Sequence, residues 1–144
     1  MTFQEELILL LKSRYPILYV STIEEDRLEY TIRKSCDGNL TRNIYVWDFI
    51  EGYKNNPNIN GIGKRNPLQA LEEIEKIGPQ IASIFILKDF RRFLSEITIS
   101  RKLRNLIKNL KTQPKTIIIV DSGVSIPAEL REYITVVEFN LPSL

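Results

Sequence analysis

Thr116-Ile117-Ile118-Ile119-Val120-Asp121 is an almost uninterrupted apolar run that ends in an acid. Such a run is typical of a strand in a parallel sheet, because helices cover both faces of that kind of sheet. Four further runs rich in apolar and β-branched residues alternate with stretches of helical periodicity. The alternation predicts an α/β fold, a three-layer α/β/α sandwich with a five-stranded parallel sheet. The four further strands are Ile17–Ser21, Asn43–Asp48, Ser83–Lys88 and Ile134–Phe139.

Helical signals fill the segments between these runs. Thr22 is followed three residues later by Glu25, which predicts a capping box and a helix to about Ser35. Pro67, in the favoured first helical position, predicts a helix that stops at Gly78. Three further helices are predicted. The first has Phe3, Leu7, Leu10 and Leu11 on one face, and the second has an apolar stripe from Ile99 to Leu110. The third begins at Pro127.

Composition excludes several classes of chemistry. The chain has 144 residues, with 43% hydrophobic and 26% charged residues, so we expect one folded domain over residues 1–144. It contains no histidine, which removes the usual general base and imidazole metal ligands. Cys36 is the only cysteine, so no internal disulfide can form and a reducing compartment is expected. The apolar run 7–11 is too short to span a membrane, so we expect a soluble protein.

The turn after the first strand is where such a fold would carry a glycine-rich phosphate loop. Here it is Val20-Ser21-Thr22-Ile23-Glu24-Glu25-Asp26, without glycine or lysine. Three carboxylates would complement the helix dipole but repel a triphosphate. We therefore expect no bound nucleotide and no catalytic or cofactor-binding residue at this turn.

Two other stretches resemble parts of a nucleotide site. Asn60-Gly61-Ile62-Gly63-Lys64-Arg65 contains a Gly-Lys pair, but it lacks the first glycine and has Arg65 where Ser or Thr would hold magnesium. It is either a mobile basic loop or a contact for a partner or anion. The third strand ends in Lys88-Asp89, and a lysine beside the acid would repel Mg²⁺. We therefore expect no metal site and interpret Asp89 as a helix cap or ion-pair partner.

Basic residues gather in one region of the chain. Residues 88–115 hold nine Lys or Arg against Asp89 and Glu96, a local charge of +7, which leaves −5 for the remainder. The region is a solvated face with ion pairs, a contact for a protein or neighbouring domain, or a phosphate-binding face. The candidate partner or anion surface, including two residues of the 49–66 loop, is Lys64, Arg65, Arg91, Arg92, Arg101, Arg104, Lys108 and Lys111.

The order of elements resembles the core of the AAA ATPases. Residues 116–121 followed by 126–130 resemble the first sensor strand of that family, and 136–142 are similar to its closing strand. The resemblance implies the strand order 5-1-4-3-2, in a degenerate AAA-like, P-loop-type core without a phosphate loop. Residues 14–19, 63–71 and 100–106, with 87–90 and 113–116, resemble more closely the N-terminal domain of an AAA-type ATPase family of algal plastids and cyanobacteria.

This resemblance implies an active ATPase domain beyond the chain, with ATP and Mg in the parent protein and no cofactor here. It implies a plastid stroma or a cyanobacterial cytoplasm. We expect a non-catalytic assembly or recognition module whose partners are the downstream ATPase domain, a second copy or another protein. The alternative is a nucleic-acid-binding module that uses the basic helix around residues 91–111.

Overall fold

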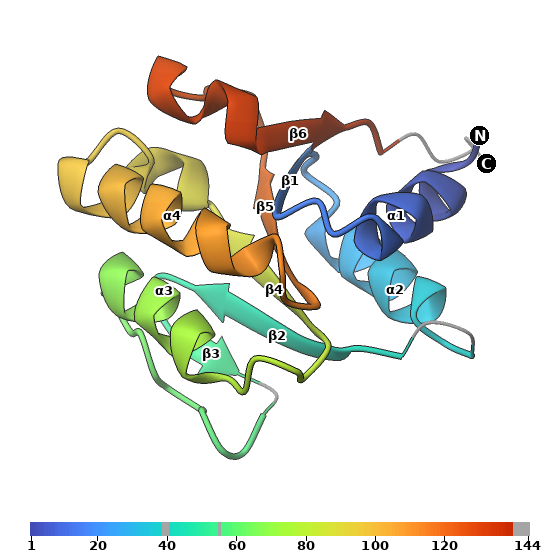
Figure 1. Cartoon of the computed structure of the whole chain (residues 1–144), viewed down its shortest axis with the longest axis horizontal. Helices are drawn as coiled ribbons and strands as arrows, with labels where there is room; N and C mark the ends of the chain where they lie inside the picture. The colour runs from blue at the N-terminus through green and yellow to red at the C-terminus, as the bar shows by residue number, and fades with distance from the viewer. Residues whose placement is uncertain (39–40, 55, 140–144) are drawn as a thin grey trace.

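The computed structural model describes residues 1–38, 41–54 and 56–139, which form a sheet between two layers of helices (Figure 1). The strands are β1 (Ile17–Ser21), β2 (Asn43–Asp48), β3 (Gly52–Lys54), β4 (Ser83–Lys88), β5 (Lys115–Asp121) and β6 (Ile134–Val137). The α-helices are α1 (Phe3–Lys12), α2 (Glu25–Ser35), α3 (Pro67–Lys76) and α4 (Ile97–Leu110). Two 3₁₀ helices are η1 (Phe90–Phe93) and η2 (Ala128–Tyr133).

The sheet has the order β3-β2-β4-β5-β1-β6. Its five parallel strands are the predicted ones, and they stand in the predicted order 5-1-4-3-2. The prediction of a five-stranded, wholly parallel sheet is wrong in one respect, because β3 adds a sixth, antiparallel strand beside β2. This strand lies inside the predicted 49–66 loop, and with only three residues it gives no readable alternation.

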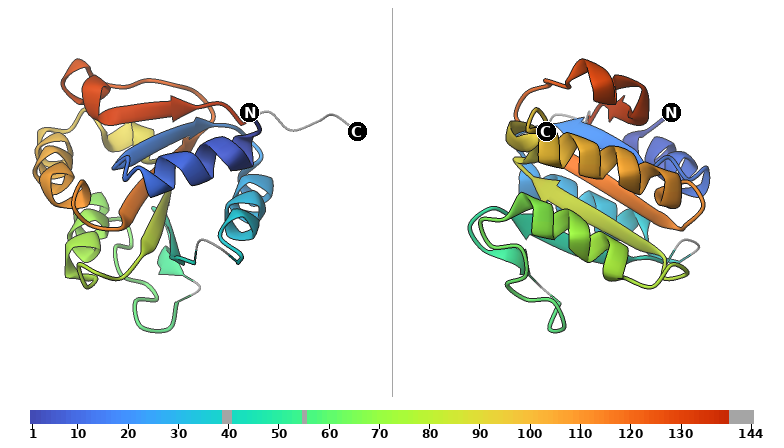
Figure 2. Two further views of the ribbon diagram at one scale, coloured as in Figure 1. Left: turned by 45° about the vertical axis from the view of Figure 1, so that its right-hand side comes forward. Right: turned by 60° about the vertical axis from the view of Figure 1, so that its left-hand side comes forward.

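Two apolar cores lie on opposite faces of the sheet. Helices α1 and α2 cover one face through residues such as Leu7, Leu11 and Ile32. Helices α3 and α4 cover the other through Leu71, Ile74 and Leu103, and Figure 2 shows the two helical layers from both sides. All seven residues of β5 are buried, as a central parallel strand requires.

The start of α2 corrects a prediction. The helix begins at Glu25, and its N-cap residue Glu24 makes no side-chain capping bond. Thr22 Oγ1 accepts a hydrogen bond from the Glu24 amide instead (3.0 Å). The capping box that is present lies at the start of α1, where Thr2 and Glu5 bond each other's amides at 3.1 Å. The last strand was predicted to reach Phe139, but it ends at Val137. Residues 140–142, the end of the segment that resembles the closing AAA strand, lie outside the described part.

Candidate interaction surface

The turn after β1 holds carboxylates at the carboxyl edge of the sheet. Its amides are used internally: the Thr22 amide donates to Asp121 O (2.8 Å) and the Glu24 amide to Thr22 Oγ1. Glu25 and Asp26 stand in the first turn of α2. With Lys88 they line an open hollow of about 430 Å³. The amides of Thr22 and Glu24 are therefore not available to a phosphate.

Negative charge dominates this edge. Burial raises the pKa of Glu25, and the neighbouring carboxylates of Asp89, Asp26 and Asp48 add to that effect, while Lys88 opposes it. A raised pKa of a carboxyl group means that its surroundings disfavour the anion. Within the described ranges, no group of three or more His, Cys, Asp or Glu side chains is arranged to hold a metal ion.

The predicted role of Asp89 is wrong in its detail. The residue occupies the N-cap position of η1 with a left-handed backbone (φ 59°), but its side chain makes no capping bond. It is exposed and forms none of the salt bridges found in the described part of the chain. Its neighbour Lys88 instead points to Glu29, with Nζ 3.7 Å from Oε1.

Arg91, one of the candidate surface cations, is occupied in a buried ion pair. Its Nη2 lies 3.3 Å from Asp121 Oδ1, and the Asp121 side chain is almost fully buried at the end of β5. The amide of Ser122 donates to the same oxygen at 2.7 Å. Above the pair, the Tyr19 hydroxyl donates to Gly123 O. Arg91 therefore neutralises Asp121 at the carboxyl edge of the sheet and is not a free surface charge.

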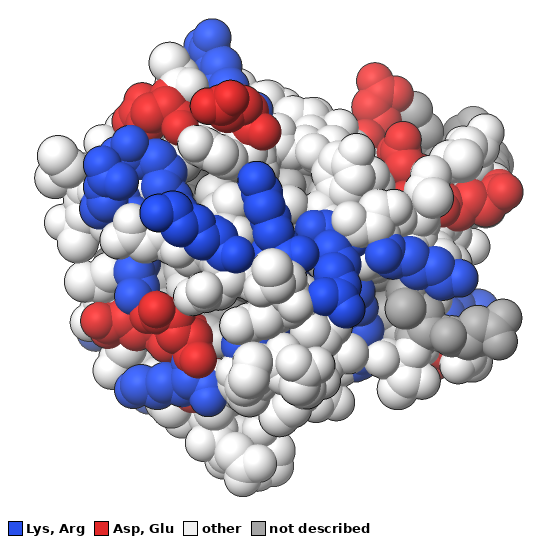
Figure 3. Space-filling model, in the orientation of Figure 1, with Lys and Arg blue, Asp and Glu red and all other residues white. Residues whose placement is uncertain are grey.

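Helix α4 and its C-cap residue Lys111 carry a row of four cations, of which Arg104 also donates from Nε to Ser100 O (3.4 Å). Arg101, Arg104, Lys108 and Lys111 succeed one another at spacings of three or four residues, so they share the solvent side of the helix. The opposite side buries the predicted stripe of Ile99, Leu103, Leu106, Ile107 and Leu110. None of the four cations forms a salt bridge within residues 1–38, 41–54 and 56–139. Figure 3 shows the resulting blue band, hereafter the α4 stripe, across the face that α4 occupies in Figure 1.

Lys64 and Arg65 do not join the α4 stripe. Lys64 lines a hollow beside β3, and Arg65 lines another between the first turns of α3 and α4. Their loop is held at several points: the Trp47 indole donates to Gly63 O (2.9 Å), the Gly63 amide donates to Gln69 Oε1 (2.9 Å) and the Arg65 amide donates to Phe49 O (2.6 Å). The described part of this loop is thus hydrogen-bonded to the rest of the fold at Gly63 and Arg65. Arg92 is exposed on η1.

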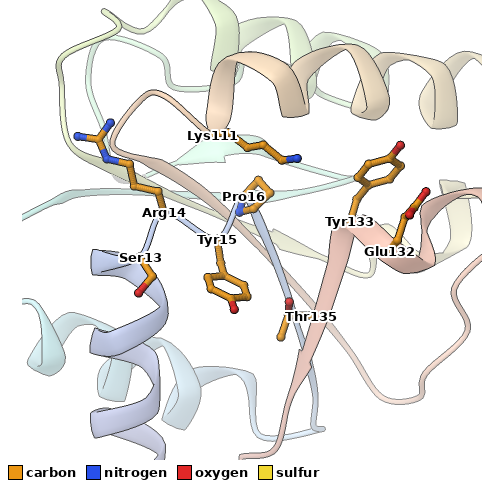
Figure 4. Close-up of a pocket in the computed structure, with 8 residues that line it drawn as sticks. All are labelled: Ser13, Arg14, Tyr15, Pro16, Lys111, Glu132, Tyr133 and Thr135. Carbon is orange, nitrogen blue, oxygen red and sulfur yellow. The ribbon is translucent and has the colours of Figure 1, made fainter.

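A pocket that the sequence analysis did not predict opens at the other end of α4. Ser13, Arg14, Tyr15 and Pro16 line it from the α1–β1 turn, Lys111 from the end of α4, and Glu132, Tyr133 and Thr135 from η2 and β6. Its volume is about 380 Å³. Figure 4 shows the Lys111 amino group extending toward Tyr133, with Pro16 between it and Tyr15. Three segments that are distant in the sequence form the pocket, so no local sequence pattern predicts it.

The sheet order and the acidic turn together define a class of protein: an AAA-like α/β core without a phosphate loop. The chain belongs to the family of SpoVK-like AAA ATPase N-terminal domains, whose model matches residues 3–139. It is 61% identical over 142 residues to the uncharacterized AAA domain-containing protein ycf46 of Trieres chinensis, and 53% identical over 144 residues to the protein of that name from Pyropia yezoensis. The matches cover 99% and 100% of the chain but 29% of each relative.

A solved structure shares the fold. Thermotoga maritima RuvB, as its T158V variant, superposes with a TM-score of 0.56 at 14% identity, over 94% of this chain and 43% of that one. None of the helices in the described part of the chain has the length and apolar character needed to cross a membrane.

Proposed function

We propose that this chain is a non-catalytic assembly or recognition module at the N-terminal end of a longer AAA-type ATPase. The single observation that carries the proposal is the α4 stripe: Arg101, Lys108 and Lys111 are exposed, Arg104 is half-buried, and none of the four has a carboxylate partner in the described chain. Unpaired charge on a folded surface is available to steer and hold a partner of opposite charge. The acidic turn after β1 supports the non-catalytic part of the proposal, because its Thr22 and Glu24 amides are already bonded within the chain.

In this proposal the chemistry belongs to the parent protein. The curated relatives that the chain matches are more than three times its length, which leaves room for an ATPase domain that binds ATP and Mg²⁺. The module's partners are that downstream domain, a second copy or another protein. The algal relatives favour a plastid stroma as the compartment.

Calorimetric titration with ATP and Mg²⁺ tests the non-catalytic assignment. We expect no binding up to about 1 mM nucleotide, because each like-charge contact at the turn after β1 opposes the phosphates. Binding in the micromolar range would contradict the assignment.

Charge reversal tests the recognition assignment in the full-length parent. The double change Arg101→Glu and Lys108→Glu should weaken assembly or partner capture about tenfold or more, since each reversal replaces attraction by repulsion. Sedimentation velocity of the purified parent measures the assembly. Lys34→Glu is the matched control, because Lys34 is an exposed cation of α2 on the other face of the sheet. Equal assembly of the double variant and the control would overturn the proposal.

A further inference from the structure

The α4 stripe and the pocket at its end share one residue. Lys111 is the last cation of the stripe, and its side chain also lines the pocket with Tyr15, Pro16 and Tyr133 (Figure 4). Its amino group forms no salt bridge or hydrogen bond within the described residues. A ligand that reaches Lys111 from the stripe therefore also meets two tyrosine rings and a proline.

A strained turn holds the pocket in shape. Arg14 follows α1 with φ 57°, a left-handed conformation that glycine usually supplies at a helix end. The turn is closed by hydrogen bonds from the Arg14 amide to Leu11 O (3.2 Å) and from the Tyr15 amide to Leu10 O (3.1 Å). The Arg14 guanidinium donates to Thr112 O at 2.7 Å, just beyond α4. This link fixes the Tyr15 wall of the pocket relative to Lys111.

The lining selects an aromatic group next to an acid. Tyr15 is 43% exposed, a large ring left open to solvent in the pocket that Lys111 also lines. An aromatic side chain that enters the pocket would contact the tyrosines that line it, and buried aromatic anchors dominate the energy of many interfaces. A carboxylate beside that anchor would pair with Lys111.

Carboxylates along the border disfavour a polyanion. Glu132 lines the pocket itself, Glu75 pairs with Lys102 beside the stripe, and Glu129 accepts a hydrogen bond from Ser100 Oγ (3.4 Å). A nucleic acid would set phosphates against these acids, whereas a protein can place neutral or basic side chains opposite them. The mixed border therefore favours a protein ligand.

The geometry points to one class of partner for this surface: an acidic protein segment that lays carboxylates along Arg101–Lys111 and inserts an aromatic side chain beside an acid into the Tyr15–Tyr133 pocket. The inference rests on the proposed function and names the partner chemistry of the same surface. The first and last of the four cations are ten residue steps apart, about 15 Å at the helical rise. Carboxylates at spacings of three or four residues on a partner helix would match them.

The test uses acetylated and amidated dipeptides and nuclear magnetic resonance of the chain. We expect Asp-Trp to bind with a Kd of about 1 mM, a weak affinity that suits a ligand of this size. Its shifts should fall on residues 13–16, 111 and 133–135. Asp-Ala and Asn-Trp should each bind at least about fivefold more weakly, because each lacks one of the two contacts.

Variants separate the two contacts. Tyr15→Ala should weaken Asp-Trp binding at least about fivefold, and Tyr15→Phe should restore it, since the ring supplies the apolar contact. Lys111→Gln should abolish the preference for Asp-Trp over Asn-Trp, whereas Lys34→Gln on α2 should leave it intact. Equal binding of all three dipeptides, or shifts outside the pocket, would overturn the inference.

A single-stranded DNA octamer forms the last arm. If the octamer binds the same residues more tightly than Asp-Trp does, and its binding weakens with salt, the protein assignment is overturned. The salt dependence is the signature of phosphate contacts, because they release counterions. Failure in the dipeptide arm leaves the charge-reversal experiment on the parent unaffected. The pocket ligand and the proposed function can therefore fail separately.

Discussion

Acidic side chains gather at the carboxyl edge of the sheet, where Lys54, Lys88 and Arg91 pair with acids, whereas cations hold backbone carbonyls at the amino edge. At the carboxyl edge, Glu25 and Asp26 follow β1, Asp48 ends β2, and Asp121 ends β5. At the amino edge, the half-buried Arg42 just before β2 donates to Leu11 O, and the buried Lys115 at the start of β5 donates to Ile74 O. A nucleotide-binding core needs positive charge and free amides at its carboxyl edge. The comparison teaches that the acidic carboxyl edge of this fold differs in charge from the edge that such a core needs.

Arg42 gives the largest expected effect at the amino edge. Its guanidinium donates to Leu11 O (2.9 Å), Pro114 O (3.2 Å) and Thr116 Oγ1 (3.3 Å). Arg42→Ala should lower the free energy of unfolding by about 3 kcal/mol, because it leaves these acceptors without a charged donor. Urea unfolding measures it. Arg33→Ala, which removes an exposed pair with Glu29, should lower the free energy of unfolding by only about 0.5 kcal/mol. Similar losses for both variants would show that the hydrogen bonds of Arg42 do not stabilise the fold more than an exposed ion pair does.

Gly63 tests the packing of the loop that joins the carboxyl edge to α3. A Cβ at Gly63 would lie 2.8 Å from Trp47 Nε1, and the residue has φ +84°. Gly63→Ala should therefore cost about 2 kcal/mol or more in urea unfolding. Gly38 has a similar φ of +81° but nothing within 4 Å, so Gly38→Ala should cost only about 1 kcal/mol. The difference isolates the clash with Trp47, and its absence would contradict the tight loop packing.

Tyr53 predicts how the stability depends on alkaline pH. The ring is fully buried on β3, its hydroxyl donates to Ala70 O (2.7 Å), and burial, assisted by Glu73, raises its pKa well above the usual value. For an acid with a raised folded pKa, the stabilising contribution is complete below the unfolded pKa of about 10 and is lost as the pH rises above it. The wild-type chain should therefore lose more stability than Tyr53→Phe between about pH 8 and about pH 11.

Urea unfolding at the two pH values measures this loss. Tyr53→Phe should also cost about 1 kcal/mol near pH 8, because the bond to Ala70 O is lost. Tyr30→Phe, at an exposed position of α2, should behave like the wild type at both pH values. An identical alkaline loss in the wild type and Tyr53→Phe would show that the ionisation of Tyr53 does not contribute.

Glu25 gives the smallest expected effect and tests the polarity of the carboxyl edge. Because burial and neighbouring acids raise the pKa of Glu25, its charge opposes folding above the unfolded pKa. Glu25→Gln should raise the stability by about 0.5 kcal/mol or less at neutral pH, with the gain disappearing below about pH 4, where both states are protonated. Thermal unfolding at pH 7 and about pH 3.5 measures it. Destabilisation at pH 7 would show that the helix dipole outweighs the acidic neighbours.

The strands and helices could be predicted from the sequence better than the contacts between them. Apolar runs located five strands, and the resemblance to AAA cores supplied their order. Short or distant features were missed: β3 has three residues, and the partner of Arg91 is Asp121, thirty positions away. The helical period placed Arg101 to Lys111 on one solvent side, but the pocket at Lys111 required the α1–β1 turn and η2 to meet it in space.

The capping box shows how a correct motif can be assigned to the wrong place. Thr-x-x-Glu occurs both at Thr2–Glu5 and at Thr22–Glu25, and only the first forms the reciprocal bonds. At the second site the Thr22 amide is bonded to Asp121 O, which belongs to the neighbouring strand β5. Tertiary pairing thus decided between two equal local signals.

The bond from Arg42 to Leu11 O joins the first helix to a side chain that also grips the segment just before β5. Trimming the chain to begin at Pro16 would leave that guanidinium nitrogen without its acceptor and uncover the apolar side of Leu18, Ile32 and Ile118. The first fifteen residues are therefore a lid on one half of the interior, and shortened versions of the protein should aggregate where the intact chain remains dispersed.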